Sequence, residues 1–158
     1  MEQTHEPRRL LVTGGAGFIG SNFVRRVLDD RPGTAILNVD ALTYAGSLAN
    51  LDGLDAKRHA FVHADIRDAA AMREVFAEFR PDTVVNFAAD SHVDRSIESP
   101  LGFVETNALG TAVLLETARQ QWKDTGGAAR FHHVSTDEVY GSLGPGGNCN
   151  EDSRIPPS

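Results

Sequence analysis

The sequence lacks the features that define several large classes of protein. It has one cysteine, Cys149, so no disulfide can form within the chain. No apolar run approaches the roughly 20 residues of a membrane-spanning helix, and residues 1–9 lack the apolar centre of a signal peptide. Lys and Arg total 15 against 22 Asp and Glu, and the net charge of −7 argues against binding to nucleic acid or to anionic lipid. These absences favour a soluble cytoplasmic protein.

The sequence does contain enough apolar material for one folded domain, since 41% of its 158 residues are apolar. Short apolar runs typical of buried strands alternate with helical patterns. This alternation predicts an α/β fold, a doubly wound parallel sheet of the Rossmann type with helices on both faces, incomplete at the C-terminus. The predicted strands are residues 10–12, 35–39, 60–63, 83–89 and 130–135, and the predicted helices are residues 17–30, 69–79 and 101–123.

A glycine-rich turn joins the first strand to the first helix within residues 10–20, Leu-Leu-Val-Thr-Gly-Gly-Ala-Gly-Phe-Ile-Gly. Gly15, Gly17 and Gly20 match the G-x-G-x-x-G spacing, and Gly14 with the last two fits a G-x-x-G-x-x-G spacing. A missing Cβ lets the backbone approach a pyrophosphate, and the unpaired N–H groups and positive end of the helix then face that anion. The context favours dinucleotide binding, and the alternative is an ordinary tight turn.

Acidic residues follow the second and third predicted strands. Asp40 stands twenty residues after Gly20, where a dinucleotide site places an acid that accepts hydrogen bonds from the adenine ribose. A carboxylate there would repel a 2′-phosphate and Ala41 offers no cation, so we predict NAD rather than NADP. The alternative is a loop aspartate that caps the next turn. Asp65 and Ile66 fall at the edge where such sheets hold the adenine.

The ends of the last two predicted strands also carry candidate site residues. Ala88 and Ala89 suit a backbone that runs close under a ligand. Thr136, Asp137 and Glu138 bring a hydroxyl and two carboxyls to one strand end, and such carboxyls can serve as acid and base if their environments separate their pKa values. Consecutive residues of an extended chain point to opposite sides, so a turn is needed to aim both inward. The alternative is a surface Asp-Glu turn.

Other polar residues have structural interpretations. Asp68 is the predicted N-cap of helix 69–79. His59 and His63 share a strand face only loosely and have no third ligand nearby, so we expect no metal site. Apolar residues cover more than one stripe of helix 101–123, which we therefore expect to be largely buried, or buried partly by a partner subunit.

The chain contains seven segments of a known pattern: Thr-Gly-Gly-Ala-Gly-Phe-Ile-Gly (13–20), Val-Asp-Ala-Leu-Thr-Tyr-Ala-Gly (39–46), Ala-Asp-Ile-Arg-Asp (64–68), Asn-Phe-Ala-Ala-Asp-Ser-His-Val-Asp-Arg-Ser-Ile (86–97), Glu-Thr-Asn (105–107), Gly-Thr (110–111) and Ser-Thr-Asp-Glu-Val-Tyr-Gly (135–141). Together they resemble the dTDP-glucose 4,6-dehydratases, which are extended short-chain dehydrogenases/reductases. The glycine turn alone would indicate only the superfamily, whereas residues 42–46, 91–96 and 135–141 are much more specific. The resemblance covers Arg9 to about Glu151.

The resemblance implies that bound NAD+ oxidises C4 of the sugar of dTDP-glucose, that water leaves across C5 and C6, and that the hydride returns to C6. Asp137 would protonate the leaving 6-hydroxyl and Glu138 would take the C5 proton. Thr136 would hydrogen-bond the C4 oxygen, and Ser91 would touch the substrate. Family members pair as homodimers through long helices, one of which helix 101–123 matches. The implied NAD site comprises Gly14, Gly17, Phe18, Ile19, Gly20, Asp40, Thr43, Asp65, Ile66, Ala88, Ala89 and Thr106.

The chain departs from the family pattern at three points. Asp90 and Ala41 stand where the family often has Glu and Lys, and neither change threatens the chemistry. C4 oxidation in this superfamily needs a Tyr-x-x-x-Lys pair, in which the lysine lowers the pKa of the tyrosine. The two tyrosines of this chain are followed four positions later by Leu48 and Gly144. We expect the pair soon after Ser158, with the sugar-nucleotide domain beyond it.

Residues 1–158 are therefore expected to form the N-terminal part of an NAD-binding domain. A sibling NAD-dependent sugar-nucleotide epimerase or decarboxylase is one alternative, and the Asp137-Glu138 pair argues against it because an epimerase expels no water. A non-catalytic NAD-binding module is another, and the missing Tyr-x-x-x-Lys supports it. The sugar's nucleotide is not specified by these residues.

We predict that residues 1–158 alone do not turn over dTDP-glucose, because the tyrosine that would act as base is not among them. The measurement is the rate at which the purified 158-residue chain forms a 4-keto-6-deoxy sugar nucleotide in the presence of NAD. A measurable dehydratase rate would refute this prediction.

Overall fold

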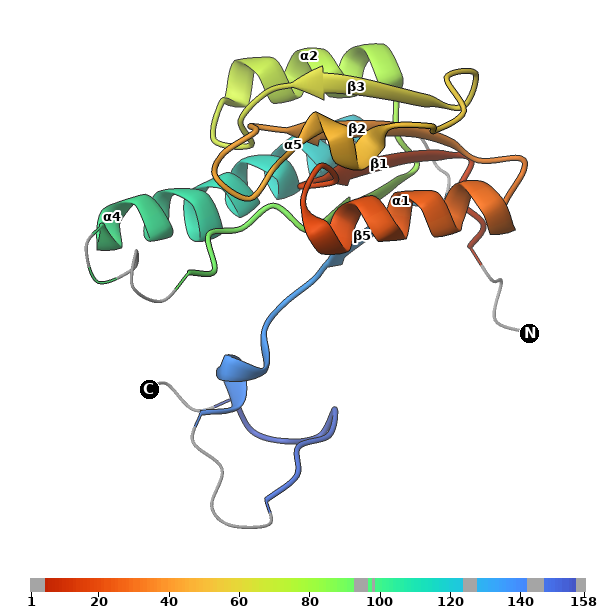
Figure 1. Ribbon diagram of the computed structural model, residues 1–158. Coiled ribbons are helices and arrows are strands. Elements are labelled where there is room, and N and C mark those ends of the chain that lie inside the picture. The colour runs from red at the N-terminus through yellow and green to blue at the C-terminus, as the bar shows by residue number, and fades with distance from the viewer. Residues whose placement is uncertain (1–4, 93–96, 98, 124–127, 142–146, 156–158) are drawn as a thin grey trace.

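The computed structural model describes residues 5–92, 97, 99–123, 128–141 and 147–155. Its strands are β1 (Arg9–Thr13), β2 (Ala35–Asp40), β3 (His59–His63), β4 (Thr83–Asn86) and β5 (Arg130–His133). They form one parallel sheet in the order β3-β2-β1-β4-β5 (Figure 1). The carboxyl ends of all five strands therefore meet at one edge of the sheet.

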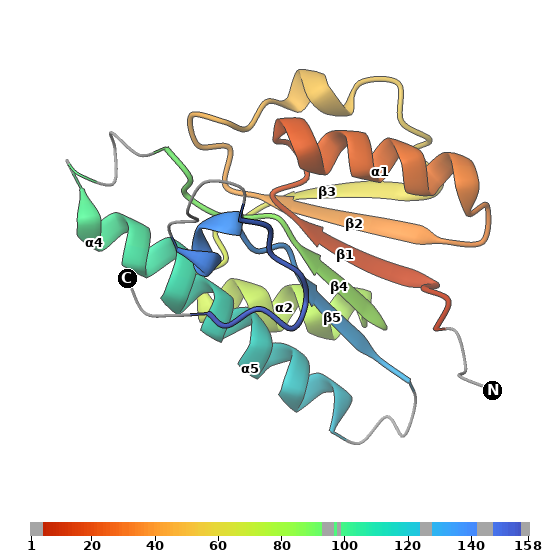
Figure 2. The same ribbon diagram turned by 90° about the horizontal axis from the view of Figure 1, so that it is seen from below.

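Helices cover both faces of this sheet. They are α1 (Phe18–Asp30), α2 (Ala69–Phe79), α4 (Pro100–Phe103) and α5 (Thr111–Trp122), with a π-helical segment η2 (Val104–Gly110) and single 3-10 turns at η1 (Leu48–Leu51) and η3 (Asp137–Tyr140). α1 lies on one face, and α2 and α5 lie on the other (Figures 1 and 2). The predicted doubly wound α/β fold of the Rossmann type is confirmed.

Strand β1 is the centre of the core because its alternate residues face opposite layers. Leu10 and Val12 pack with Val24 of α1, and Leu11 packs with Phe76 of α2, all at most 1% exposed. Burial on both faces is typical of the central strand of a parallel sheet. Each such side chain contributes about 1.5–3 kcal/mol when it leaves water. The glycine turn that follows β1 is thus attached to the central strand of the fold.

The last two strands end earlier than predicted, β4 by three residues and β5 by two. The backbone of Phe87 still donates to the carbonyl of Thr13 at 3.0 Å, and the chain then leaves the sheet. The alanines at 88 and 89 and the residues at 136 to 138 consequently lie in the loops and turns after the strands. Side chains of those loops, rather than sheet pairing, must fix their positions.

The predicted helix 101–123 is present, but the π-helical segment η2 interrupts it. The expectation that it is largely buried is wrong within this chain, because Leu101, Val104, Leu109 and Leu115 are between 47% and 76% exposed. Only one stripe of α5 faces α2 and the sheet. That a partner subunit buries these exposed side chains stays a prediction.

Some sequence patterns fall outside the described residues, namely 93–96 of the segment at 86–97 and parts of the predicted loops at 124–127 and 142–146. Among the helices in the described ranges, none has both the length and the apolar character needed to cross a membrane.

Helix α2 begins where the sequence predicts, because Asp68 caps it. The Asp68 carboxylate accepts hydrogen bonds from the backbone N–H groups of Ala70 at 2.9 Å and Ala71 at 3.0 Å. The helix ends at Phe79; its C-cap, Arg80, adopts a left-handed φ of 49° and is followed by Pro81. The predicted N-cap is confirmed.

Replacing Asp68 with Ala should lower the free energy of unfolding by about 1 kcal/mol, because the first turn of α2 loses its acceptor. Urea unfolding followed by circular dichroism measures the change. Asp29→Ala is the matched control, since this exposed aspartate lies near the C-terminal end of α1, where a negative charge is slightly unfavourable. An equal loss in both variants would contradict the capping assignment.

Candidate functional site

The glycine turn between β1 and α1 is packed too tightly for side chains. Gly14 has a φ of +69°, and a Cβ there would lie 2.6 Å from the backbone nitrogen of Ala88. A Cβ on Gly20 would lie 2.8 Å from the Cα of Gly15, and one on Gly17 would lie 3.3 Å from the carbonyl oxygen of Gly14. The glycines therefore let the turn close on itself and against the loop after β4.

Hydrogen bonds attach this turn to the neighbouring strand β2. The backbone N–H of Gly14 donates to the carbonyl of Val39 at 2.9 Å. The Asp40 carboxylate accepts from the N–H of Ala16 at 2.9 Å with one oxygen and from the N–H of Leu42 at 2.8 Å with the other, and Asp40 is 8% exposed. The capping role left open for Asp40 is thus present. Hydrogen bonding to a ribose would use the remaining lone pairs and stays a prediction.

The start of α1 offers an uncompensated positive end. Among the described residues no side chain caps the helix, and its first turn contains no acid, so its N–H groups and dipole favour a bound anion. Phe18 and Ile19 are 81% and 65% exposed beside it. The carbonyl of Ala16 accepts from the side chain of Asn50 at 2.8 Å and the N–H of Ser47 at 3.0 Å, which fixes the loop after β2 on the turn.

Arg67 holds the carboxylate that follows β3. Its guanidinium donates to both oxygens of Asp65 at 2.7 to 3.1 Å and to Glu105 at 3.1 Å. Hydrogen bonding by Arg67 lowers the pKa of Asp65, against the opposing effect of partial burial. Ile66 is 4% exposed and lies 2.6 Å from where a Cβ on Gly110 would stand, so η2 rests on it. Arg67 thus links the predicted adenine edge to η2.

The π-helical segment η2 fixes the loop after β4. The Asn107 side chain accepts from the N–H of Asp90 and donates to its carbonyl, both at 2.8 Å. The hydroxyl of Thr106 donates to the Asp90 carboxylate at 3.2 Å. Thr106, a predicted cofactor residue, therefore contacts the loop beside the turn. π-Helical segments frequently occur at functional sites.

A buried polar network joins the ends of β1, β4 and β5. The Thr13 hydroxyl donates to the Asn86 side chain and accepts from the N–H of Ala88 at 3.4 Å. The Asn86 amide also contacts Nδ1 of His133 at 3.0 Å and the hydroxyl of Thr111 at 3.4 Å. Ala88, predicted to lie under a ligand, is thereby held next to the glycine turn.

The structure does not bring Thr136, Asp137 and Glu138 against the glycine turn. The N–H of Glu138 donates to the Thr136 hydroxyl at 3.3 Å, and η3 supplies the local turn that the two carboxyls need. All three residues are exposed, and Figures 1 and 2 show η3 apart from the glycine turn. Their catalytic roles stay predictions.

The remaining predicted residues lie on exposed loops. Thr43 and Ser91 are on two segments that approach each other, since the rings of Tyr44 and His92 stand 6.3 Å apart in an edge-on arrangement. Ala89 is exposed beside them in the loop after β4.

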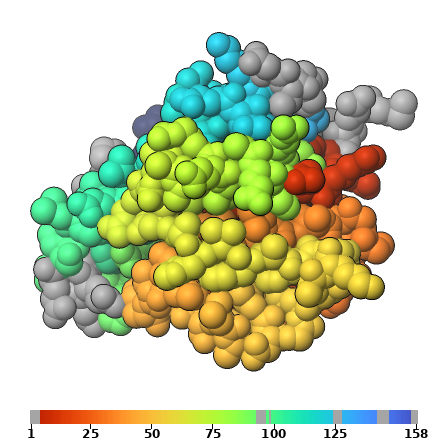
Figure 3. Space-filling view, turned by 90° about the horizontal axis from the view of Figure 1, so that it is seen from above, coloured from red at the N-terminus to blue at the C-terminus, as the bar shows by residue number. Residues whose placement is uncertain are grey.

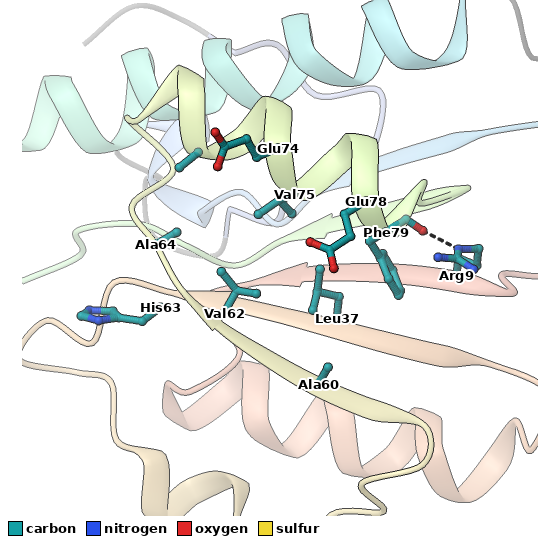
Figure 4. A pocket seen from close by; sticks show the side chains of 11 residues that line it. Arg9, Leu37, Ala60, Val62, His63, Ala64, Glu74, Val75, Glu78 and Phe79 are labelled. Atoms are coloured by element: carbon teal, nitrogen blue, oxygen red, sulfur yellow. Dashed lines mark hydrogen bonds between the residues drawn. The ribbon is translucent and has the colours of Figure 1, made fainter.

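A surface hollow of about 570 Å³ lies between α2 and β3, which are neighbours in the space-filling view (Figure 3). Leu37 and Val62 form part of its wall, and Glu74, Glu78 and Arg9 stand around it (Figure 4). It is on the α2 face of the sheet, away from the glycine turn. Within the described ranges no three His, Cys, Asp or Glu residues are grouped to hold a metal ion.

Arg67 and Asn107 were not singled out by sequence reasoning. Both lie inside the segments that carry the family resemblance, 64–68 and 105–107, directly beside predicted site residues. Their place in these segments, next to predicted site residues, is the sequence feature by which they could have been identified.

The fold and the glycine turn define a chain of the short-chain dehydrogenase/reductase type. A family model described as GDP-mannose 4,6 dehydratase matches residues 11–158, and the chain belongs to this family.

The chain is also similar to named enzymes and solved structures. A dTDP-glucose 4,6-dehydratase of Shigella flexneri is 51% identical over 153 residues, which cover 94% of this chain and 42% of that protein. The crystal structure of a dTDP-glucose 4,6-dehydratase from Streptomyces venezuelae with NAD bound is 49% identical, with a TM-score of 0.82 over 94% of this chain and 45% of that one. A UDP-glucose 4-epimerase of Thermus thermophilus in complex with NAD is 35% identical, with a TM-score of 0.81 over 94% and 44%. The chain thus spans less than half the length of these relatives, and the predicted resemblance to the dTDP-glucose 4,6-dehydratases is confirmed.

Replacing Arg67 with Met should lower the free energy of unfolding at neutral pH by about 0.5–1 kcal/mol, because Asp65 and Glu105 lose their shared cation. A carboxyl whose pKa is lowered in the folded state stabilises the fold above its ordinary pKa of 3.8, and this contribution disappears as the pH falls through the lowered value. The difference in the free energy of unfolding between wild type and variant should therefore become smaller as the pH falls.

Urea unfolding at neutral pH and in steps down to about pH 3 measures this difference. Arg26→Met, which breaks the Arg26–Asp30 pair on the exposed side of α1, is the matched control. A gap between wild type and the Arg67 variant that widens in acid would contradict the assignment.

Proposed function

We propose that this chain carries the N-terminal part of the NAD-binding domain of a dTDP-glucose 4,6-dehydratase. One observation carries the proposal: the glycine turn, Asp40 and the loop after β4 meet at one sheet edge in a chain 51% identical to an enzyme of that name. The chain spans 42% of that relative, so the whole activity is inferred for the full-length protein.

The contacts of the turn support an NAD site. The start of α1 and the glycine turn would receive the pyrophosphate, because N–H groups and the helix dipole face it. Asp40 would accept hydrogen bonds from the adenine ribose, and its negative charge disfavours a 2′-phosphate. Asp65 and Ile66, held by Arg67 and η2, would border the adenine.

The residues after β5 would supply the acid and the base. Bound NAD would supply a hydride acceptor for C4 of the sugar and a hydride donor for C6. Glu138 would accept the C5 proton, and Asp137 would donate a proton to the leaving 6-hydroxyl, so that one water is lost. Thr136 would hold the C4 oxygen and Ser91 would contact the substrate. Because η3 stands apart from the glycine turn, this role requires η3 to approach the turn in the complete enzyme.

The exposed apolar side chains along α4, η2 and α5 support a homodimer. Large apolar side chains that are half or more exposed along one helix are typical of an interface. They are Leu101, Val104 and Leu109, with Leu115 at 47%.

A sugar-nucleotide 4-epimerase is the second candidate, favoured by the epimerase neighbour with a TM-score of 0.81. An epimerase returns the hydride to C4 and expels no water. The Asp137-Glu138 pair is the feature that argues for a dehydratase.

Replacing Glu138 with Gln in the complete enzyme should reduce formation of the 4-keto-6-deoxy product by about 10²–10⁴-fold, because the base for C5 is lost. Oxidation at C4 should remain, so the absorbance of reduced nicotinamide should rise on mixing with dTDP-glucose. Mass spectrometry of the sugar nucleotide reports the loss of water.

Glu78→Gln is the matched control, since Glu78 lies on α2 beside the surface hollow, and it should keep wild-type turnover. Interconversion of glucose and galactose nucleotides by the wild-type enzyme, without loss of water, would show that the dehydratase proposal is wrong.

A further inference from the structure

Strand β2 meets the glycine turn at three consecutive residues. Val39 and Asp40 hold it through the hydrogen bonds described above. The third residue is Asn38, whose side chain lies directly beneath Gly15. A Cβ added to Gly15 would collide with the whole amide of Asn38, with Oδ1 nearest, then Cγ at 2.6 Å and Nδ2 at 2.7 Å. Since Gly15 has no left-handed φ, the contact with Asn38, rather than the backbone conformation, requires glycine there.

The Asn38 side chain is also an unusual core group. Asn38 is 0% exposed, and neither its Oδ1 nor its Nδ2 has a hydrogen-bond partner within the described part of the chain. A buried amide without partners disfavours the folded state, and an apolar side chain of similar size would favour it more. Unsatisfied buried groups of this kind call for an explanation, and here the group faces the turn that would hold a ligand.

We propose that Asn38 is a positioning residue for the cofactor, whose amide supports the glycine turn from beneath at Gly15. The inference rests on the proposed NAD site. The carbonyls of Gly14 and Ala16 already accept hydrogen bonds from Gly17 and from Ser47 and Asn50. The peptide groups at Gly15 are therefore the part of the turn that the Asn38 amide adjoins, and the amide gains a partner there when the ligand fixes the turn.

Asn38→Leu separates this role from a structural one. The variant should have a melting temperature equal to or above that of the wild type, and its dissociation constant for NAD should rise at least tenfold. Ile36→Leu is the matched control, because Ile36 is two residues earlier on the same face of β2 and packs in the core under α1. The control should leave the affinity for NAD unchanged within about twofold. Wild-type affinity in Asn38→Leu would overturn the proposal, and so would a lower melting temperature, which would reveal a structural amide.

A second pair of variants tests the contact itself. Gly15→Ala should weaken NAD binding at least tenfold, because its methyl group collides with Asn38. Asn38→Ala removes the other side of the same contact, so the two effects should not add, and the double variant should bind NAD within about threefold of Gly15→Ala alone. Additive losses in the double variant would overturn the proposal.

Isothermal titration with NAD, on protein expressed from the complete coding sequence, gives these affinities. Absence of NAD binding by the wild type would remove the proposed function and this inference together. Wild-type binding with no change in the variants would remove this inference alone.

Discussion

The hydrogen bond from the N–H of Ala16 to the carboxylate of Asp40, 2.9 Å long, is the contact on which the rest of the site depends. Bonds from backbone N–H groups to an ionised carboxylate are among the stronger hydrogen bonds in proteins. With the bond from Gly14 to Val39, it attaches the turn to β2 as well as to β1. These two attachments fix the turn from which α1 begins.

The sheet alone does not complete the site. A parallel sheet places its strand ends at one edge, but the loops beyond them are positioned by side chains. Arg67 ties the loop after β3 to η2, Asn107 ties the loop after β4 to η2, and Thr13 with Asn86 joins the central strands. Each of these contacts links segments far apart in the sequence. The loops at the carboxyl edge of the sheet are therefore positioned by polar contacts, whereas the sheet itself is held by its hydrophobic core.

Local patterns explain what the sequence could predict. The strands, α1, α2 and the Asp68 cap follow from apolar periodicity and capping chemistry, which act over a few residues. The π-helical segment could not be predicted, because its contacts are with residues far away in the sequence: Gly110 lies against Ile66, and Glu105 pairs with Arg67. The exposure of Leu101 and its neighbours was missed because periodicity reports apolar character and not what covers it. The position of η3 was likewise beyond local patterns, since η3 comes after the last paired residues of β5 and is not itself part of the sheet.

The glycine turn that is hydrogen-bonded to Asp40 would be the binding site for NAD. Isothermal titration of the protein with NAD and with NADP tests it most directly, because the two ligands differ only by the 2′-phosphate that would face Asp40. We expect NAD to bind more tightly than NADP by roughly tenfold or more. Equal affinity for the two, or tighter binding of NADP, would contradict it.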